Sequence, residues 1–405
     1  MPPRLLFLLL TLSPVVTTAA ERLDVRGIIE AHAFYNDSDN SWLDGGFSKL
    51  RYDQDSTPVA LGKAGLNIDL RVTDTLWFRS MAAMYLDNDI DAEFIEAYLQ
   101  YRPVPAGPLR WRARLGAFHL PGSLENRGIA WSSLYSTTPS VINAWIGEDI
   151  RVVGSEVTLS WPGRFRGSLH DFSITAAVFG FNDGIGTVLA YRGWASHDRQ
   201  TGFGTALRLP SFAGGVKREY EPIVEIDDRP GYYIHAGWGY AGKLELGFMH
   251  YDNRADAAAN RDRQNAWRTR FEHVTLQWDV TENLRLLGQY MTGYTEADIR
   301  VIGFYSDVDF ASGYLMLVWR QDPHRVSLRG ELFETEDQDI FTTPDHNSDE
   351  TGHAIMLSYA YNFNTNWEIG AEWMHVRSKR VDRLDRIGFG TESENQLLFT
   401  ATYRF

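Results

Sequence analysis

The sequence has no cysteine, which excludes disulfide bonds, thiolate nucleophiles and cysteine-ligated zinc. It also has no long apolar run beyond the amino-terminal segment, so nothing approaches the roughly 20 apolar residues that a membrane-spanning helix requires. Helical periodicity is not sustained anywhere, and no long helix is predicted. Stability without disulfides must come from another source, and a closed, hydrogen-bonded β-barrel is one such source.

Positive charge is scarce relative to negative charge, and motifs for catalysis are missing. The formal net charge is −14, which argues against nucleic acid as a partner. The 11 histidines show no metal-ligand spacing such as His-Glu-x-x-His, and no Gly-x-Ser-x-Gly sequence occurs. We therefore expect no metal site, no cofactor and no enzymatic activity. His170-Asp171 with a distant serine leaves an enzyme as an alternative.

The amino terminus has the pattern of a secretory signal peptide. Arg4 precedes the apolar run Leu5 to Leu12, and small residues at 18–20 offer a cleavage site. Residues 1–20 are therefore predicted to be removed on export.

The rest of the chain alternates apolar and polar residues in segments of about ten to fourteen residues, the length that a tilted strand needs to cross a bilayer. In Lys63–Val72, for example, Leu66, Ile68 and Leu70 alternate with polar residues. Equally regular alternation occurs in Leu109–Ala117, Asn283–Tyr294, Arg325–Leu332 and Gln396–Phe405. These segments predict transmembrane β-strands.

Short turns alternate with longer polar stretches along the whole chain. Counting them predicts about 18 antiparallel strands, with both termini on the short-turn side. The weakest pair is Thr201–Leu209 with Val216–Ile226, and without it the prediction becomes about 16 strands. Soluble propellers and sandwiches also contain many strands, but they do not predict long loops on one side alone.

The signal peptide, the alternating strands, the one-sided loops and the aromatic carboxyl terminus Phe405 together resemble the porins of Gram-negative bacteria. The resemblance covers residues 21–405, and no local motif selects a subfamily, although there is weak similarity to phosphate-selective porins. The aromatic content of 13% suits the interfacial girdles of such barrels. The resemblance implies an all-β transmembrane barrel in the bacterial outer membrane, in contact with lipid and lipopolysaccharide. It also implies a homotrimer.

The longest connection, residues 120–149, is the third on the long-loop side. It is too apolar for a mobile surface loop and needs a surface to pack against. In porins the third loop folds into the barrel and narrows it, so the resemblance implies a constriction loop here. A loop folded over the mouth or into a subunit contact is the alternative. Its charged residues are Glu125, Arg127, Glu148 and Asp149.

A ladder of basic side chains is predicted on the inner wall. Arg110, Arg112 and Arg114 share one face of a strand, and a lipid-facing arginine at the membrane centre costs roughly 2–4 kcal/mol. We expect these residues to face the lumen. Neighbouring strands add Lys63, Arg71 and Arg79.

If Glu125, Glu148 and Asp149 lie opposite this ladder, the constriction has a basic and an acidic side. The alternative is that the arginines pair with nearby carboxylates and merely solvate the wall. The predicted function is passive diffusion of small hydrophilic solutes and ions through a water-filled channel. A channel selective for anions such as phosphate and carboxylates, or for sugars through Trp131, Tyr135 and Trp145, is the alternative.

Overall fold

The computed structural model describes residues 22–405 except 87–89, 211–218, 300–303 and 340–346. The predicted signal peptide, residues 1–20, lies outside the described residues. Among the residues that are described, no helix is long and apolar enough to cross a membrane.

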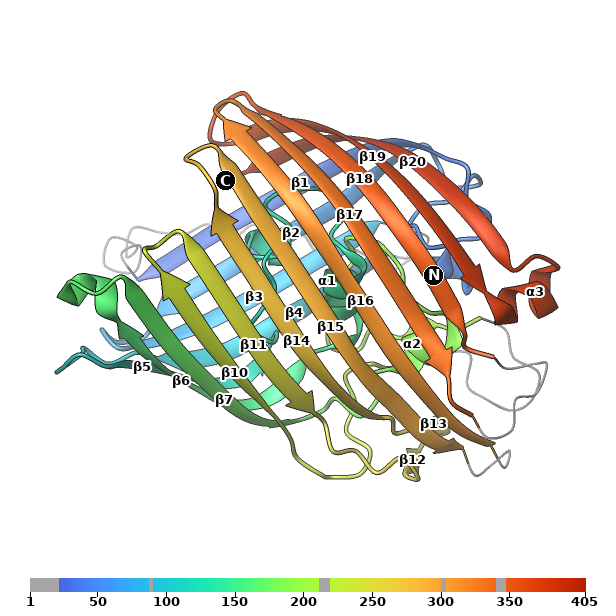
Figure 1. The fold of residues 1–405 in the computed structure, drawn as a ribbon, viewed down its shortest axis with the longest axis horizontal. Coiled ribbons are helices and arrows are strands. Elements are labelled where there is room, and N and C mark those ends of the chain that lie inside the picture. The colour runs from blue at the N-terminus through green and yellow to red at the C-terminus, as the bar shows by residue number, and fades with distance from the viewer. Residues whose placement is uncertain (1–21, 87–89, 211–218, 300–303, 340–346) are drawn as a thin grey trace, which may run out of the picture.

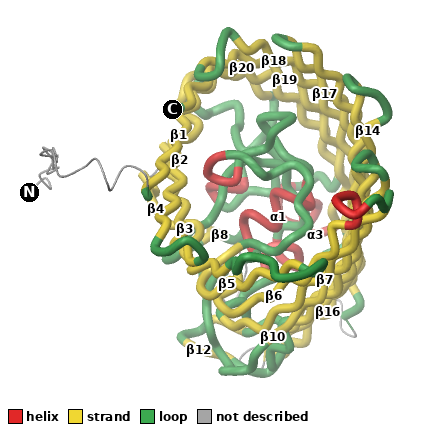
Figure 2. Tube along the Cα trace, turned by 90° about the vertical axis from the view of Figure 1, so that its left-hand side faces the viewer, coloured by secondary structure: helices red, strands yellow, loops and turns green. Residues whose placement is uncertain are grey.

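Sixteen of the described strands form one closed antiparallel barrel (Figures 1 and 2). The predicted all-β barrel is therefore confirmed. In order round the ring the strands are β1 (Leu23–Asn36), β2 (Val59–Arg71), β3 (Leu76–Leu86), β4 (Ile90–Tyr101), β5 (Arg110–Phe118), β6 (Val152–Pro162), β7 (His170–Gly180), β10 (Gly231–Tyr240), β11 (Leu244–Asp252), β14 (Arg268–Asp279), β15 (Leu284–Ile299), β16 (Phe304–Gln321), β17 (His324–Asp337), β18 (Glu350–Asn362), β19 (Trp367–Arg380) and β20 (Thr391–Arg404).

The strand count of 18 was wrong, and the alternative of 16 is correct. The described residues between β7 and β10 contribute no strand to the barrel wall. Instead, β8 (Leu207–Arg208) and β9 (Glu219–Tyr220) pair only with each other. Leu207 and Tyr220 are buried against other loop residues, so their apolar character reflects packing inside the barrel and not contact with lipid.

The long connections lie at one end of the barrel, here the loop side, and the short turns lie at the other, the turn side (Figure 1). Three of the long connections are buried against one another. They are loop 1 (residues 37–58), loop 3 (119–151) and loop 4 (181–230). Loop 3 contains helix α1 (Val141–Asp149), loop 4 contains α2 (Thr187–Tyr191), and α3 (Val381–Ile387) follows β19.

The first and last strands pair with each other and close the ring. Strand β1 pairs with β20 from Ile28 opposite Arg404 to Asn36 opposite Gln396. Beyond that register, the Gly27 amide donates to the Phe405 carbonyl at 2.9 Å, and the Phe405 amide donates to Gly27 at 3.1 Å. The Phe405 ring covers Gly27, since a Cβ on this glycine would lie 2.1 Å from the ring.

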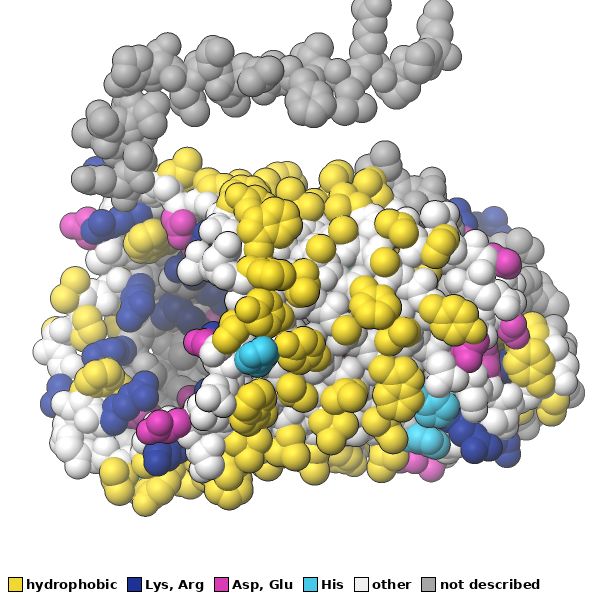
Figure 3. Space-filling model, turned by 90° about the horizontal axis from the view of Figure 1, so that it is seen from above, with side chains coloured by type: hydrophobic (Ala, Val, Ile, Leu, Met, Phe, Trp, Pro, Cys, Tyr) yellow, Lys and Arg dark blue, Asp and Glu magenta, His cyan; other side chains and the backbone are white. Residues whose placement is uncertain are grey.

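The outer face of the barrel is an apolar belt (Figure 3). Aromatic residues gather where the strands approach the turns, as the girdle of a membrane barrel requires. Exposed aliphatic and phenyl side chains of the belt include Leu66, Leu99, Leu115, Val157, Ile174, Phe248, Leu315, Leu332, Ile355 and Phe399. Exposed aromatic residues near the turns include Trp111, Tyr240, Trp278, Trp319 and Trp367.

The inner face divides into two unlike parts. On β1 to β5 it is polar and largely basic toward the turn side. On β15 to β19 it carries buried apolar side chains that pack with loops 3 and 4 in one cluster. Members from the wall include Met291, Phe310, Met316, Phe333, Met356 and Met374. The barrel therefore encloses a hydrophobic core on one side of its interior.

We predict that removal of Phe405 impairs barrel assembly more than conductance. The deletion removes two backbone hydrogen bonds at the seam, which together contribute about 2 kcal/mol. Gly27→Val should act in the same direction because its side chain displaces the Phe405 ring. The folded fraction can be measured from the mobility of unheated protein in a denaturing gel.

Gly330→Ala is the control, since a Cβ at Gly330 meets no atom within 4 Å. Assembly of the Phe405-deleted chain to the wild-type extent would show that the seam does not depend on this residue.

Candidate functional site

The predicted basic ladder lies on the inner wall of β2, β3 and β5. Cross-strand pairing places carboxylates beside two of its members: Asp69 of β2 is opposite Arg79 of β3, and Glu156 of β6 is opposite Arg114 of β5. The turn-side mouth is hollowed, and blue basic side chains surround the hollow in Figure 3.

One carboxylate, Glu156, lies close to two arginines of this wall. Glu156 accepts hydrogen bonds from Arg114 at 2.8 and 2.5 Å, in the parallel arrangement that suits a guanidinium. Arg112 lies 3.8 Å from the same carboxylate and donates to Thr158 at 3.3 Å. Arg110 forms no ion pair among the described residues, and its guanidinium lies over the Phe165 ring at 5.1 Å. The wall therefore keeps an excess of positive charge.

The other three members of the ladder have different surroundings. Arg79 lies 3.5 Å from Asp69, which Arg26 also approaches at 3.0 Å. Arg71 pairs with Asp74 in the adjacent turn at 2.7 Å. Lys63 is buried at the other end of its strand, and its ammonium lies 3.7 Å from Asp198 of loop 4.

Loop 3 leaves β5 and contacts β17, which is half-way round the ring. Glu125 and Arg329 of β17 are both fully buried and form an ion pair at 3.0 Å. The backbone amide of Val141, at the start of α1, donates to Glu331 at 2.9 Å. A carboxylate at this end of a helix is favoured by the helix dipole.

Loop 3 also contacts the wall near its own origin. The Ala130 amide donates to Asn67 of β2 at 2.9 Å. Gly65 is required there, because a Cβ on it would lie 2.2 Å from the Ala130 side chain. Loop 3 thus touches two walls of the barrel, and loops and helices occupy the interior in Figure 2.

The carboxylates of loop 3 do not face the arginine wall. Glu125 is held by Arg329, Ser140 and Asn143. Glu148 and Asp149 are buried against loop 4. The expected acidic side opposite the ladder is therefore not formed by these three residues. Arg127 is exposed, donates to the Ser123 carbonyl at 3.0 Å, and lines a cavity of about 410 Å³ toward the turn side.

Loop 4 is the segment of the interior that the sequence reasoning missed. Arg192 donates two hydrogen bonds to Glu148, at 2.8 and 2.6 Å, and the His197 ring lies 3.2 Å from the same carboxylate. Burial alone would raise the pKa of Glu148, but Arg192 and then His197 hold it below its usual range. Glu148 therefore stays ionised and fixes loop 4 on loop 3.

Asp149 is the second link between the two loops. Its carboxylate accepts from the Gly186 amide at 2.7 Å, from the Tyr220 hydroxyl at 2.8 Å and from the Trp145 indole at 2.9 Å. Burial raises the pKa of Asp149 to about 7, and the nearby charge of Glu148 adds to that rise. The three donors oppose the rise without cancelling it.

Loop 4 also reaches loop 1 and the far wall. Asp198 pairs with Arg51 of loop 1 at 2.7 Å. The Trp194 amide donates to Glu350 of β18 at 3.0 Å, and this carboxylate also pairs with Lys49 of loop 1. The three loops are therefore interlocked on the loop side of the barrel. We call loops 1, 3 and 4 together the loop plug.

The apolar residues of loop 4 could have indicated this placement. Ile185, Val188, Leu189, Tyr191 and Trp194 are as poorly suited to a mobile surface loop as those of loop 3. The apolar content that predicts an infolded loop 3 therefore predicts an infolded loop 4 as well.

The aromatic residues of loop 3 belong to the packed core. Trp145 lies among Trp194, Phe271 and Phe310, with ring centroids 5.2 to 5.8 Å apart. Trp131 stacks on His119 at 4.3 Å. These two indoles are buried and do not form an exposed track for a sugar.

A narrow polar space remains between loop 3 and the wall. It measures about 20 Å³, which is room for about one water molecule. Hydroxyl groups of loop 3 face charged residues of β1, β2, β17 and β19 across it. The lining includes Ser132, Ser133, Ser136, Thr137, Glu30, Lys63, Arg325 and Glu368.

Comparison with known proteins gives the fold. No family model matches the chain, and no curated protein matches its sequence. Among solved structures, the outer-membrane channel DcaP of Acinetobacter baumannii is 13% identical, with a TM-score of 0.56 over 95% of this chain and 97% of that one. The chain has the fold of an outer-membrane porin.

Two further structures share this porin fold. The anion-selective porin from Comamonas acidovorans is 14% identical, with a TM-score of 0.53 over 95% of this chain and 99% of that one. A loop-deleted OmpT, an outer-membrane protein of Vibrio cholerae, is 12% identical, with a TM-score of 0.55 and the same coverage of both chains. The closed ladder and the apolar belt are those of a bacterial outer-membrane barrel.

We predict that Glu148→Gln releases loop 4 from loop 3. The change leaves Arg192 buried without its carboxylate, and breaking a buried ion pair in this way costs about 3–5 kcal/mol. Loop 4 should then be cut by protease in the folded barrel at a higher rate. Arg208→Gln is the control, since Arg208 also lies in loop 4 but is exposed beside Asp44. Equal protection of loop 4 in wild type and Glu148→Gln would contradict the link.

We predict that the contact between loops 3 and 4 weakens as the pH rises. Because the folded pKa of Asp149 is raised, its contribution to stability is complete below its unfolded pKa of about 4 and is lost as the pH passes about 7. Hydrogen exchange of residues 182–192 should therefore be slower at pH 5 than at pH 8. Asp183 of loop 4 also has a pKa raised by burial to about 7, so Asp149→Asn is needed for the assignment.

If Asp149→Asn keeps the full pH dependence of exchange, Asp149 is not the titrating group.

Proposed function

We propose that the protein is an outer-membrane channel for passive diffusion of small hydrophilic solutes and ions, with a preference for anions. The observation that carries this proposal is the basic wall of β2, β3 and β5. There, Glu156 lies beside both Arg112 and Arg114, and Arg110 pairs with no carboxylate in the part of the chain that the structure describes. Guanidinium groups bind phosphate and carboxylate through paired hydrogen bonds.

The basic wall acts by its field on solutes in the turn-side vestibule. A wall with excess positive charge raises the local concentration of anions and lowers that of cations. The arginines of this wall form the proposed selectivity region. It consists of Arg71, Arg79, Arg110, Arg112 and Arg114, with Arg127 of loop 3 beside the vestibule.

Loops 3 and 4 supply the narrow part of the proposed channel. Glu125, Glu148 and Asp149 hold these loops in place and do not line the path. The space beside loop 3 holds about one water molecule, and in this proposal the plug shifts to let solutes pass. The resting conductance should therefore be low.

The remaining parts of the proposal follow the porin fold. We infer a homotrimer with no enzymatic activity, located in the outer membrane with its loop side toward the cell exterior. A solved OmpT of Vibrio cholerae, described as a trimer form, shares the fold at a TM-score of 0.52. Sugar selectivity is a weaker candidate because Trp131 and Trp145 are buried in the core.

We predict a reversal potential that reports anion preference in a planar bilayer with a salt gradient. Replacing Arg110 and Arg112 by glutamine should lower the anion-to-cation permeability ratio, because each charge at about 4 Å through water favours an anion about fivefold and disfavours a cation about fivefold. Arg320→Gln is the control, because Arg320 is an exposed residue beside Asp322 at a turn. Cation preference in the wild type would refute the proposed selectivity, and absence of conductance under all conditions would refute the channel.

A further inference from the structure

Three side chains of the kinds that bind metal ions converge between the barrel wall and loop 4. Glu30 and His32 lie two residues apart on β1, so both side chains are on the inner face of this strand. Asp198 reaches them from loop 4. All three are buried, and one ligand atom from each lies within 4.8 Å of the other two. The spacing of the histidines did not indicate this group, because its third member is distant in sequence.

The imidazole of His32 is oriented for coordination through one ring nitrogen. Its Nδ1 lies 2.8 Å from the Tyr52 hydroxyl, and its Nε2 lies 2.9 Å from the Glu30 carboxylate. Histidines that bind metal ions donate their other ring N–H to an oxygen in this way, which fixes the tautomer and the ring orientation. A metal ion at Nε2 would leave the Nδ1 proton to be donated to Tyr52.

Asp198 has one oxygen in an ion pair and one oxygen without a hydrogen bond. Its Oδ1 accepts from Arg51 at 2.7 Å, whereas its Oδ2 is closed to solvent and has no hydrogen-bond partner among the described residues. The Lys63 ammonium lies 3.7 Å from Oδ2, which is too far for a hydrogen bond. Since a buried carboxylate oxygen normally has a partner, this atom is suited to bind a metal ion.

Lys63 competes with a metal ion for this site. Burial alone would raise the pKa of Asp198, but Arg51 and then Lys63 hold it below its usual range, so the carboxylate is ionised. Arg51 is also fixed by its bond to the Gly62 carbonyl at 2.8 Å, whereas Lys63 makes no hydrogen bond in the described part of the chain. The flexible Lys63 side chain can therefore withdraw, and a divalent ion can replace its ammonium.

A second group of three carboxylates, in loop 4, does not offer the same conditions. Asp183, Glu225 and Asp227 also lie within 4.8 Å of one another, but only Asp183 is buried and the group has no nitrogen ligand. Each of these carboxylates already accepts a hydrogen bond from a backbone amide of the same loop. Those bonds account for the group as part of the loop conformation.

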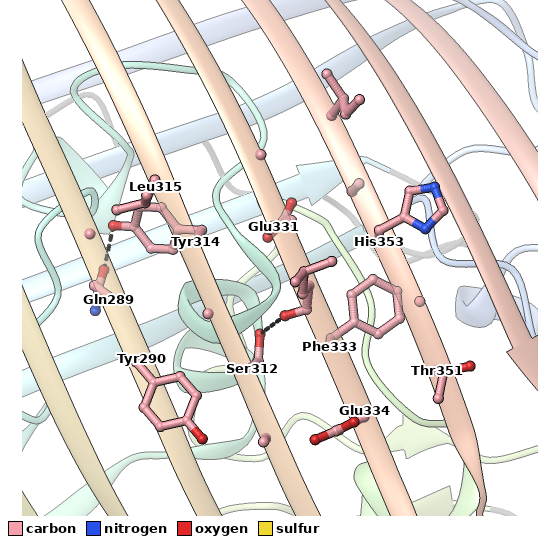
Figure 4. Close-up of a pocket in the computed structure, with 18 of the residues that line it drawn as sticks. Gln289, Tyr290, Ser312, Tyr314, Leu315, Glu331, Phe333, Glu334, Thr351 and His353 are labelled. Atoms are coloured by element: carbon pink, nitrogen blue, oxygen red, sulfur yellow. Dashed lines mark hydrogen bonds between the residues drawn. The ribbon is translucent and has the colours of Figure 1, made fainter.

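Ligand-type side chains also line a groove of about 1090 Å³ on the outer face between β14 and β18, but they do not converge. Figure 4 shows His353, Glu331 and Glu334 well apart from one another. Glu331 is buried and binds the Val141 amide, whereas His353 and Glu334 are exposed. Burial, a nitrogen ligand and a carboxylate oxygen without a donor therefore coincide at the β1 site.

We infer that Glu30, His32 and Asp198 form a binding site for a zinc ion, which joins loop 4 to the barrel wall. One imidazole with two carboxylates suits zinc, whereas calcium and magnesium favour oxygen ligands alone. Ligand atoms around a tetrahedral zinc lie about 3.4 Å apart, so the three side chains need to shift by only about 1–2 Å. Glu30 also lines the polar space beside loop 3, which has room for about one water molecule as a fourth ligand.

Zinc binding is tested by titrating the folded barrel in detergent with zinc in competition with a chromogenic chelator. The wild type should bind one zinc ion tightly. Asp198→Asn and His32→Gln should each weaken this binding by at least about tenfold, since loss of a hydrogen bond to a metal ligand already costs about 10- to 100-fold. His32→Gln leaves the pair of Asp198 with Arg51 in place. Asp183→Asn, in the other carboxylate group, is the control and should leave the tight site unchanged.

Lys63→Met tests the competition between the ammonium and the ion. It removes the positive charge 3.7 Å from Asp198 and should tighten zinc binding by at least about tenfold, because a unit charge repels a divalent ion strongly at this distance even through water. The inference is overturned if the wild type binds zinc no more tightly than Asp198→Asn and His32→Gln, or if Asp183→Asn abolishes the tight site. An affinity that does not change in Lys63→Met would also overturn it.

The link between loop 4 and the wall is tested by protease cutting of loop 4 in the folded barrel. Zinc should slow the cutting in the wild type and not in His32→Gln, and equal rates with and without zinc in the wild type would contradict the link. Conductance of the same proteins should fall with zinc in the wild type alone, and this last effect rests on the proposed function. If the protein does not conduct, the channel proposal fails while the binding and protease results stand.

Discussion

The structure depends on closure of the hydrogen-bonded ladder between β1 and β20. In a bilayer, each unpaired backbone group costs several kcal/mol, so a sheet that spans the membrane cannot keep open edges. The short turns, the position of both termini and the contact between Gly27 and Phe405 follow from this closure. Closure also creates an interior that does not contact lipid, so its side chains can be polar or charged.

The interior then determines how the protein can work. On one side of it, apolar residues such as Phe310 and Met356 must be covered, and loops 3 and 4 cover them. On the other side, arginines remain exposed to the vestibule. The same chain therefore combines a packed core on the loop side with a basic wall on the turn side. The buried pair of Glu148 with Arg192 joins the two loops that separate these regions.

The sequence was sufficient to predict the barrel strands but not the loops that pack inside the barrel. Alternation predicts strands such as Lys63–Val72 correctly because lipid and interior impose opposite polarity on successive residues. Thr201–Leu209 was read as a strand because residues buried inside the barrel are as apolar as residues facing lipid. The partner of Glu125 could not be predicted either, since Arg329 is distant in sequence and the path of loop 3 depends on tertiary packing.

The central claim is that the loop plug closes the barrel and must move for solutes to pass. Leu50 of loop 1 and Ser196 of loop 4 form a parallel bridge, a spacing that suits a disulfide, and the chain has no other cysteine. Single-channel conductance of the Leu50→Cys, Ser196→Cys variant is the direct measurement. The account predicts low conductance when the variant is oxidised and a higher conductance after reduction. An oxidised variant that conducts as well as the reduced one would contradict it.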